Sequence, residues 1–265
     1  MSTEDKENEN EKEIKVTKTS GGINLKIEAL PTSKSKVKRS CMMEENIVPA
    51  HPFRLHISGS SGSGKTNCLL TMLTRREFYK NYFHIIFIVS LTAKKTDDVY
   101  DILEENKGRT KIAFINELDE TIIGDIMDIA SGIVEEVKAH KAPRVLMVFD
   151  DVVSEKKFLN KKEFTKCFIM SRHFNMSSII LSQKYNATPR TCRLNCDAVI
   201  YFPGSVSEDL VITDDYCAPG YSKREFLQIL KFATSEPYSF FFINMKCLHK
   251  CRYRRNFDTI LELLR

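Results

Sequence analysis

The sequence predicts an α/β fold in which helices flank a mostly parallel β-sheet, and three observations lead to this prediction. Strand-like and helix-like segments alternate from about residue 48 onward. Two strand-like segments, His84–Ser90 and Val145–Phe149, are continuous apolar runs, as expected for strands that are covered on both faces. Segment 119–140 repeats apolar side chains at helical spacing. Such alternation is typical of a sheet whose parallel strands are joined by helices.

The expected elements follow in order along the chain. Short runs rich in β-branched and aromatic residues predict strands at 53–58, 84–90, 111–116, 145–149, 178–182, 198–202 and 238–244. Helical spacing of apolar residues predicts helices at 67–73, 119–140, 161–172 and 221–233, and a short closing helix at 260–264. The chain shows no internal repeat.

The composition divides the 265 residues into a charged N-terminal tail, residues 1–47, and one domain, residues 48–265. The tail has few apolar residues, so we expect it to be flexible and disordered. Its acids crowd into residues 4–13, and Lys34–Arg39 is basic, so an interaction arm for a partner or for DNA is the alternative. A short strand at Ile23–Ile27 is also possible, because its apolar residues alternate.

The bulk properties favour an intracellular protein. No apolar run reaches about 18 residues, so no membrane span is expected, and the acidic start does not resemble a secretory signal. The net charge of +5 permits nucleic-acid binding without requiring it. Eight cysteines without such a signal suggest reduced thiols. Cys192 with Cys196, and Cys247 with Cys251, are spaced more widely than zinc knuckles and lie in strand-like segments, so free thiols are favoured over a zinc site.

Residues 59–66 carry the strongest functional signal in the chain. They match the pattern G-x-x-x-x-G-K-[ST] of a phosphate-binding loop (P-loop, or Walker A), between a predicted strand and a predicted helix. Glycines let the backbone wrap around an anion, and the helix N-terminus adds free N–H donors. We expect Lys65 to reach the outer phosphates of a nucleoside triphosphate and Thr66 to hold Mg²⁺. The nucleotide-binding residues are Gly59, Ser60, Ser61, Gly62, Ser63, Gly64, Lys65 and Thr66.

Acidic residues at the end of a buried strand supply the second half of such a site. Val145–Phe149 runs directly into Asp150 and Asp151, which is the Walker B pattern. Asp150 is the expected Mg²⁺-associated acid, and Asp151 is placed to act as a general base. Because Asp is one methylene shorter than Glu, Glu155 on the following loop is kept as an alternative base.

Two further residues complete the candidate catalytic set. Gln183 ends a predicted strand and is placed to orient water or to sense the γ-phosphate. Arg172 follows a predicted helix at the rim of the sheet, where it would reach the phosphates of a neighbouring subunit or simply suit the helix C-terminus.

In combination, these motifs resemble a known family. Gly59–Thr66, Val145–Asp151, Ser171–His173, Ile179–Gln183 and the stretch Pro189–Asn195 are similar to the poxvirus-type genome-packaging ATPases of the HerA–FtsK superfamily, over roughly residues 48–245. The resemblance implies a RecA-like core of the class with an additional strand between the two nucleotide strands, with ATP and Mg²⁺ as cofactors. It also implies that Asp151 is the catalytic acid, Gln183 the sensor and Arg172 the arginine acting in trans, with Arg190 and Arg193 as alternates.

The function implied by the resemblance is packaging of double-stranded DNA into a preformed viral capsid. The partners would be a homo-oligomeric ring of about five or six subunits and the capsid or portal vertex, in the host-cell cytoplasm or a virus factory. A helicase, a chromosome-partition motor and a nucleotide switch are the alternatives. Three basic stretches are candidates for DNA contact: Lys156–Lys162, favoured for movement; Lys246–Arg255, favoured for grip; and Lys34–Arg39.

Overall fold

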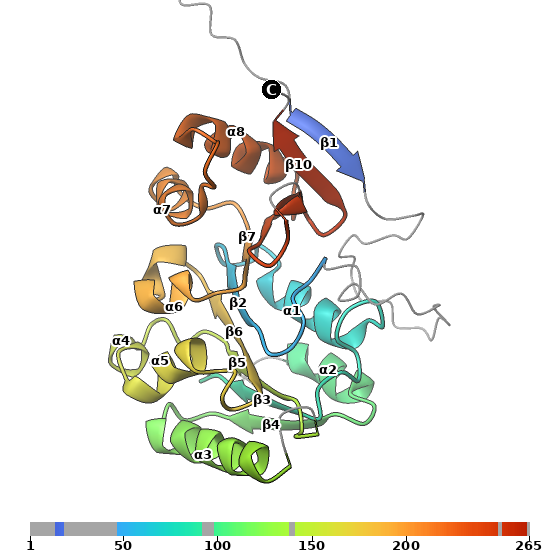
Figure 1. The fold of residues 1–265 in the computed structure, drawn as a ribbon, viewed down its shortest axis with the longest axis vertical. Helices are drawn as coiled ribbons and strands as arrows, with labels where there is room; N and C mark the ends of the chain where they lie inside the picture. The colour runs from blue at the N-terminus through green and yellow to red at the C-terminus, as the bar shows by residue number, and fades with distance from the viewer. Residues whose placement is uncertain (1–13, 19–46, 92–97, 138–140, 249–250, 264–265) are drawn as a thin grey trace, which may run out of the picture.

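The computed structural model describes residues 14–18, 47–91, 98–137, 141–248 and 251–263. Its strands form one ten-stranded sheet in the order β1-β10-β9-β8-β7-β2-β6-β5-β3-β4. Figure 1 shows this sheet running from β1 at one end of the molecule to β4 at the other, with helices on both sides. The predicted strand at Ile23–Ile27 and the basic stretch Lys34–Arg39 lie outside the described residues.

Six neighbouring strands are parallel and form the part of the sheet that carries the site. In spatial order they are β7 (Ala198–Tyr201), β2 (Arg54–Ser58), β6 (Met176–Ser182), β5 (Val145–Phe149), β3 (Ile85–Val89) and β4 (Lys111–Ile115). The strand β6 lies between β2, which leads into the P-loop, and β5, which leads into Asp150. This order confirms the predicted RecA-like P-loop fold with an additional strand.

The other end of the sheet is antiparallel. It consists of β8 (Phe241–Asn244), β9 (Tyr253–Arg255), β10 (Thr259–Leu263) and β1 (Ile14–Lys18). The prediction of a closing helix at 260–264 is therefore wrong, because pairing with β9 and β1 holds this segment extended. β1 and the buried Ile47 lie within residues 1–47, the segment expected to be a flexible tail, and for the rest of that segment the tail stays a prediction.

Two helical layers cover the sheet. One contains α1 (Lys65–Thr74), the 3₁₀ turn η1 (Asp98–Tyr100) and α2 (Asp101–Asn106). The other contains α3 (Glu120–Val137), α4 (Lys156–Leu159), α5 (Lys162–Ile169), the 3₁₀ turn η2 (Tyr185–Ala187), α6 (Arg190–Leu194), α7 (Val206–Tyr216) and α8 (Lys223–Ala233). Alternate strand residues enter the two cores: in β5, Met147 packs on the α3 side and Val148 on the α1 side. This alternation explains why the parallel strands are continuously apolar.

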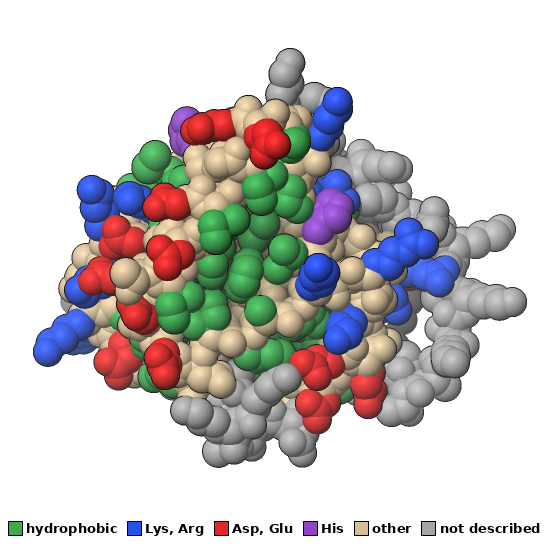
Figure 2. Space-filling view, turned by 90° about the horizontal axis from the view of Figure 1, so that it is seen from below, with side chains coloured by type: hydrophobic (Ala, Val, Ile, Leu, Met, Phe, Trp, Pro, Cys, Tyr) green, Lys and Arg blue, Asp and Glu red, His purple; other side chains and the backbone are tan. Residues whose placement is uncertain are grey.

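Apolar side chains also reach the surface at the β4 end of the molecule. Figure 2 shows them gathered across the face that lies at the bottom of Figure 1, where α3 and β4 are found. Ile129 of α3 is 65% exposed. Contiguous exposed apolar surface of this kind is commonly an interaction surface. Within the described residues, every helix is too short or too polar to cross a lipid bilayer.

Candidate active site

The P-loop connects the end of β2 to the start of α1. The loop is tied to the neighbouring strand, because the backbone N–H of Gly59 donates to the carbonyl of Ser182 at the end of β6 (3.1 Å). Gly62 and Gly64 have φ angles of +74° and +101°, in the region that favours glycine. Gly64 directly precedes α1, so the first N–H groups of that helix point into the loop without helical partners.

Gly59 is required by a close approach rather than by its φ angle. A Cβ atom at this position would lie 2.5 Å from Cβ of Phe202 and 2.8 Å from Oγ of Ser63. Phe202 follows β7 and is buried under the loop. The first glycine of the motif therefore allows the loop to rest directly on the aromatic core.

Lys65 is folded back onto its own loop. Its Nζ donates to the carbonyls of Gly59 and Ser60, both at 2.8 Å. Burial lowers the pKa of Lys65, whereas the negative charges of Asp150 and Asp151 raise it. These interactions bring the P-loop lysine and both predicted acids into one electrostatic site.

Asp150 lies at the end of β5 and is held by a residue that the sequence did not indicate. Tyr100 donates its hydroxyl proton to Oδ2 of Asp150 at 2.5 Å. Burial raises the pKa of Asp150 and the neighbouring Asp151 raises it further, while the Tyr100 hydrogen bond and the charge of Lys65 oppose the rise. Tyr100 fixes the direction of this carboxylate.

Asp151 and Gln183 meet across the ends of β5 and β6, a contact that the sequence analysis did not specify. Nε2 of Gln183 donates to Oδ1 of Asp151 at 3.3 Å. Asp151 has φ +56°, an uncommon value for a residue with a side chain. The chain therefore turns sharply after Asp150, so that the second acid leaves the strand direction and faces Gln183. Glu155, the alternative base, instead lines an open pocket of about 380 Å³ with Glu117, Asp119 and Lys157.

The residues present fit a magnesium nucleotide. The P-loop offers backbone donors, the ammonium of Lys65 and the hydroxyl of Ser63, whose buried Oγ has no hydrogen-bond partner among the described residues. A concave set of donors of this kind suits an anion. Thr66 and Asp150 supply the hard oxygen ligands that Mg²⁺ prefers.

The three candidate arginines have different surroundings. Arg172 is exposed and precedes β6, so it lies at the edge of the sheet opposite Gln183, about 20 Å away for a strand of this length. Arg190 is also exposed, and its Nε lies 3.9 Å from Asp215.

Arg193 is buried within its own subunit, which makes it unsuitable as an arginine acting in trans. Its Nε donates to Asp215 (3.1 Å), its Nη1 donates to the carbonyl of Thr188 (3.0 Å), and its guanidinium lies 4.9 Å from the ring centre of Tyr185. It is a structural residue of this region.

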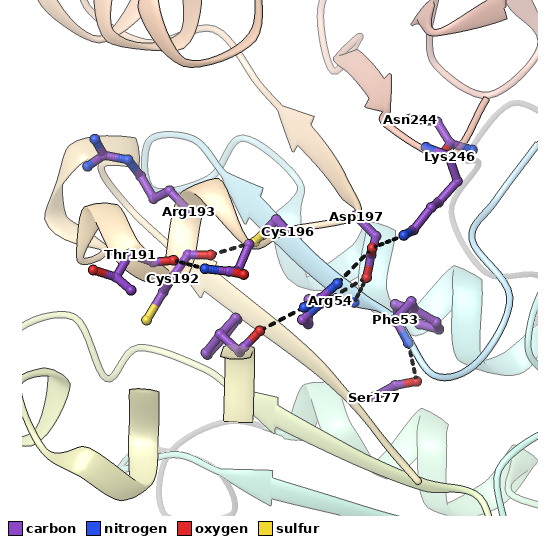
Figure 3. A network of polar contacts seen from close by, with 12 residues as sticks. Phe53, Arg54, Ser177, Thr191, Cys192, Arg193, Cys196, Asp197, Asn244 and Lys246 are labelled. Carbon is purple, nitrogen blue, oxygen red and sulfur yellow. Dashed lines mark hydrogen bonds and ion pairs between the residues drawn. The ribbon is translucent and has the colours of Figure 1, made fainter. Parts of the chain in front are cut away.

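A buried ion pair organises the same edge of the sheet as Arg172. In Figure 3, Arg54 at the start of β2 meets Asp197, which directly precedes β7, and Lys246 reaches Asp197 from the other side. Nη1 of Arg54 also donates to the carbonyl of Phe168 in α5 (3.0 Å). Burial alone would raise the pKa of Asp197, but the hydrogen bonds from Arg54 and Lys246 outweigh it and lower that pKa.

The structure changes the interpretation of the basic stretches. Arg254 is buried in β9 and donates to the carbonyl of Phe257 (3.2 Å), and Arg255 pairs with Glu236. The prediction that these two arginines grip DNA is therefore wrong, because sheet pairing directs them into the protein. In the other stretch, Lys156, Lys157 and Lys162 are exposed, and Lys161 pairs with Glu120 at 2.7 Å.

One of the cysteines lies in a position unlike that expected. Cys192 lies in the short helix α6 and not at a strand edge, and burial raises its pKa to about 12. Cys247 follows β8, and burial raises its pKa to about 11. Within the described part of the chain, no three His, Cys, Asp or Glu side chains are grouped to hold a metal ion.

The sequence did not identify two residues that contribute to this region. Tyr100 has no local motif, since it reaches Asp150 from a segment 50 residues away. His56 was assigned only to a strand, but it is fully buried in β2, bonded through Nε2 to Oγ of Ser182 (2.7 Å) and stacked on Tyr185. No pattern in the sequence predicts either contact.

Curated poxvirus proteins are similar to this chain. The "DNA packaging protein OPG160" of Variola virus is 29% identical over 170 residues, which cover 63% of this chain and 58% of that protein. The protein of the same name from Vaccinia virus (strain Copenhagen) is 30% identical over 161 residues, or 59% of this chain and 55% of that protein. The chain thus spans a little more than half the length of these relatives.

Solved structures share the fold, and a family model matches the sequence. The genome packaging NTPase B204 from Sulfolobus turreted icosahedral virus 2, in complex with AMP, matches with a TM-score of 0.51 and 12% identity, covering 73% of this chain and 93% of that one. The DNA-packaging ATPase B204 from Sulfolobus turreted icosahedral virus gives a TM-score of 0.52 and 14% identity over 74% and 94% of the two chains. The model of the Poxvirus A32 protein family matches residues 41–240, which contain the P-loop, Asp150, Asp151, Arg172 and Gln183. This chain belongs to the Poxvirus A32 protein family.

Proposed function

We propose that this protein is an ATP-hydrolysing motor that moves double-stranded DNA into a preformed viral capsid. The observation that carries the proposal is the convergence of Lys65, Asp150, Asp151 and Gln183 at one edge of the parallel sheet. Relatives named as DNA packaging proteins and as genome packaging NTPases support the choice of substrate. Such a motor would work inside the infected cell, where capsids are filled.

The residues have separable tasks in hydrolysis. Lys65 exchanges the carbonyls of Gly59 and Ser60 for phosphate oxygens. Thr66 and Asp150 would hold Mg²⁺, which would neutralise negative charge on the phosphates. Asp151 accepts a proton from the attacking water, and the Gln183 amide orients that carboxylate.

We propose that a second subunit completes the site. Arg172 lies at the opposite edge of the sheet from its own P-loop, which excludes a role in its own site and is compatible with a role in that of a neighbour. An arginine supplied in trans stabilises the charge of the transition state. We therefore propose a homo-oligomeric ring in which each subunit completes the site of the next.

The DNA contacts are assigned to the start of α4. Lys156 and Lys157 are exposed and follow Asp151 by five and six residues, so a change at the nucleotide can move them. Contacts to phosphates carry affinity without reading sequence, as a translocase requires. Replacing both by Glu should weaken DNA binding and reduce its salt dependence, whereas the matched change of Lys223 and Lys231 on α8 should not.

The test of the proposal is ATP hydrolysis over a range of protein concentrations, with and without double-stranded DNA. We expect turnover per subunit to rise with concentration and with DNA, and to be lost in Lys65→Ala and in Arg172→Ala. Mixing these two inactive variants should restore activity, because one supplies an intact P-loop and the other an intact arginine. Arg190→Ala tests the exposed alternate arginine, and it should keep wild-type turnover where Arg172 is the arginine acting in trans.

Two outcomes of this experiment would contradict the proposed motor. Turnover that is independent of both concentration and DNA would refute the motor and favour a nucleotide switch. Stimulation only by single-stranded DNA would favour a helicase.

A further inference from the structure

Tyr238 is an exposed aromatic residue beside the P-loop. Tyr238 is 74% exposed. The other exposed large apolar residues of the described part of the chain are aliphatic or Met. Most tyrosines and phenylalanines of this protein lie in the two cores. An aromatic ring left in solvent next to a ligand loop has a face available for stacking.

The backbone holds this ring in an uncommon conformation. Tyr238 is the third residue of a turn that is closed by the N–H of Ser239 donating to the carbonyl of Glu236 (3.1 Å). The hydroxyl of Ser239 donates to the same carbonyl at 2.6 Å. The φ of Tyr238 is +59°, a value that Gly or Asn adopts more easily at this position of a turn. A bulky aromatic residue therefore occupies a turn position where Gly or Asn would be less strained.

The ring lies on the side of the P-loop toward which the nucleoside of a bound nucleotide would extend. A Cβ atom built on Gly64 would be 3.8 Å from Cδ1 of Tyr238 and 3.7 Å from Cε1 of Phe202. The strand order β8-β7-β2-β6-β5 places the turn before β8 on one side of the P-loop and the groups that meet the γ-phosphate, Asp150, Asp151 and Gln183, on the other. A triphosphate bound with its γ end at those groups therefore directs its nucleoside toward Tyr238.

We propose that Tyr238 is the stacking platform for the base of the nucleotide held by the P-loop. This inference rests on the proposed function, because it names how the same site holds the nucleoside. Every base has a π-face, so a stacked tyrosine binds a purine without distinguishing adenine from guanine. The phosphates are held by the P-loop independently of Tyr238.

Calorimetric titration with three probes tests the assignment. The probes are Mg²⁺-ADP, Mg²⁺-GDP and Mg²⁺-tripolyphosphate, which has no base. We expect Tyr238→Ala to weaken ADP and GDP on the order of 10-fold each and to leave tripolyphosphate unchanged. Tyr238→Phe, which keeps the ring, should bind all three like the wild type. Because Ala and Tyr are both side-chain-bearing residues at a positive φ, the backbone strain is similar in the two.

A fluorescence experiment gives a second readout, because the chain contains no tryptophan. Tyr238→Trp places the only tryptophan of the chain on the proposed platform, where it is excited selectively over the tyrosines, and Leu248→Trp is the matched control at a residue that is 81% exposed. Leu248 follows β8, whose end pairs with the start of β7, and so lies at the opposite edge of the sheet. ADP should change the emission of the first variant and not of the second.

The outcomes separate this inference from the proposed function. Unchanged ADP affinity in Tyr238→Ala, with tripolyphosphate bound, refutes the stacking role and leaves the P-loop intact. Equal weakening of ADP and tripolyphosphate also refutes it, because Tyr238 would then act on the loop itself. If the wild-type protein binds none of the probes, the nucleotide site fails, and the proposed function fails with it.

Discussion

Breaking the buried ion pair between Arg54 and Asp197 should destabilise the protein asymmetrically. Asp197 accepts four hydrogen bonds of 2.9 Å: from the backbone N–H, Nε and Nη2 of Arg54, and from Nζ of Lys246. The side chains of Arg54 and Asp197 are 11% and 3% exposed, whereas that of Lys246 is 49% exposed. The two charges of the pair are therefore desolvated, and each depends on the other.

The expected magnitudes follow from what each change leaves behind. Asp197→Leu leaves the Arg54 guanidinium with the carbonyl of Phe168, an almost uncompensated buried charge, at a cost of about 3–5 kcal/mol. Arg54→Met should cost less, about 2 kcal/mol, because Asp197 keeps Lys246 and the backbone N–H of residue 54. The double variant should cost less than Asp197→Leu alone, since no buried charge remains unpaired.

Urea unfolding followed by circular dichroism measures these free energies. The three variants and the wild type form a double-mutant cycle, in which we expect a coupling of at least about 2 kcal/mol. Costs that add to within about 0.5 kcal/mol would refute the reasoning. So would a larger cost for Arg54→Met than for Asp197→Leu, since the structure leaves more partners to Asp197 than to Arg54.

Three other variants test the region of the nucleotide site. Burial, with a smaller contribution from a neighbouring arginine, lowers the pKa of His56 from 6.5 to about 3, so the unfolded chain binds this proton more readily than the folded one. Protonation of His56 in the unfolded chain should therefore lower the free energy of unfolding by about 2 kcal/mol between pH 7 and pH 5. Urea unfolding at the two pH values should show that this decrease is absent in His56→Asn. Tyr100→Phe should raise the Mg²⁺ concentration needed for half-maximal ATP hydrolysis several-fold with little change in thermal stability, because Asp150 loses its orienting donor; an unchanged Mg²⁺ titration would contradict this. Gly59→Ala should abolish nucleotide binding in calorimetry, since the new methyl group would lie 2.5 Å from Cβ of Phe202; wild-type affinity would show that the loop can shift without loss.

Local patterns predicted the elements of the parallel sheet well. The P-loop, the acids after β5 and the glutamine after β6 each follow a buried strand, and parallel topology then brings the strand ends to one edge. That topology brings Gln183 near Asp151, and the turn at Asp151, which has φ +56°, completes their contact. These features depend on residues close together in sequence or on a general rule of sheet geometry.

The errors fall where distant segments decide the structure. Residues 260–264 read as a helix because a short apolar run fits either state, and pairing with β9 and β1 decides for a strand. Arg254 resembled part of a solvent-facing basic cluster, but β9 lies between β8 and β10, and its side chain is buried. Tyr100 could not be assigned to Asp150, because their contact depends on how the segment before α2 packs on the sheet.

The position of β2 in the sheet has a consequence for how the chain matures on the ribosome. β2 is the first strand of the parallel set in the sequence, yet its ladder partners are β6 and β7, and the first paired residues, Arg54 and Ser178, are far apart along the chain. The backbone that shapes the P-loop is therefore unsupported until the second half of the domain has emerged from the exit tunnel. We therefore expect a nascent chain that ends before β6 to contain the complete Walker A motif without a formed nucleotide-binding loop. We therefore expect nucleotide binding to begin only after the second half of the core has been synthesised and has paired with β2.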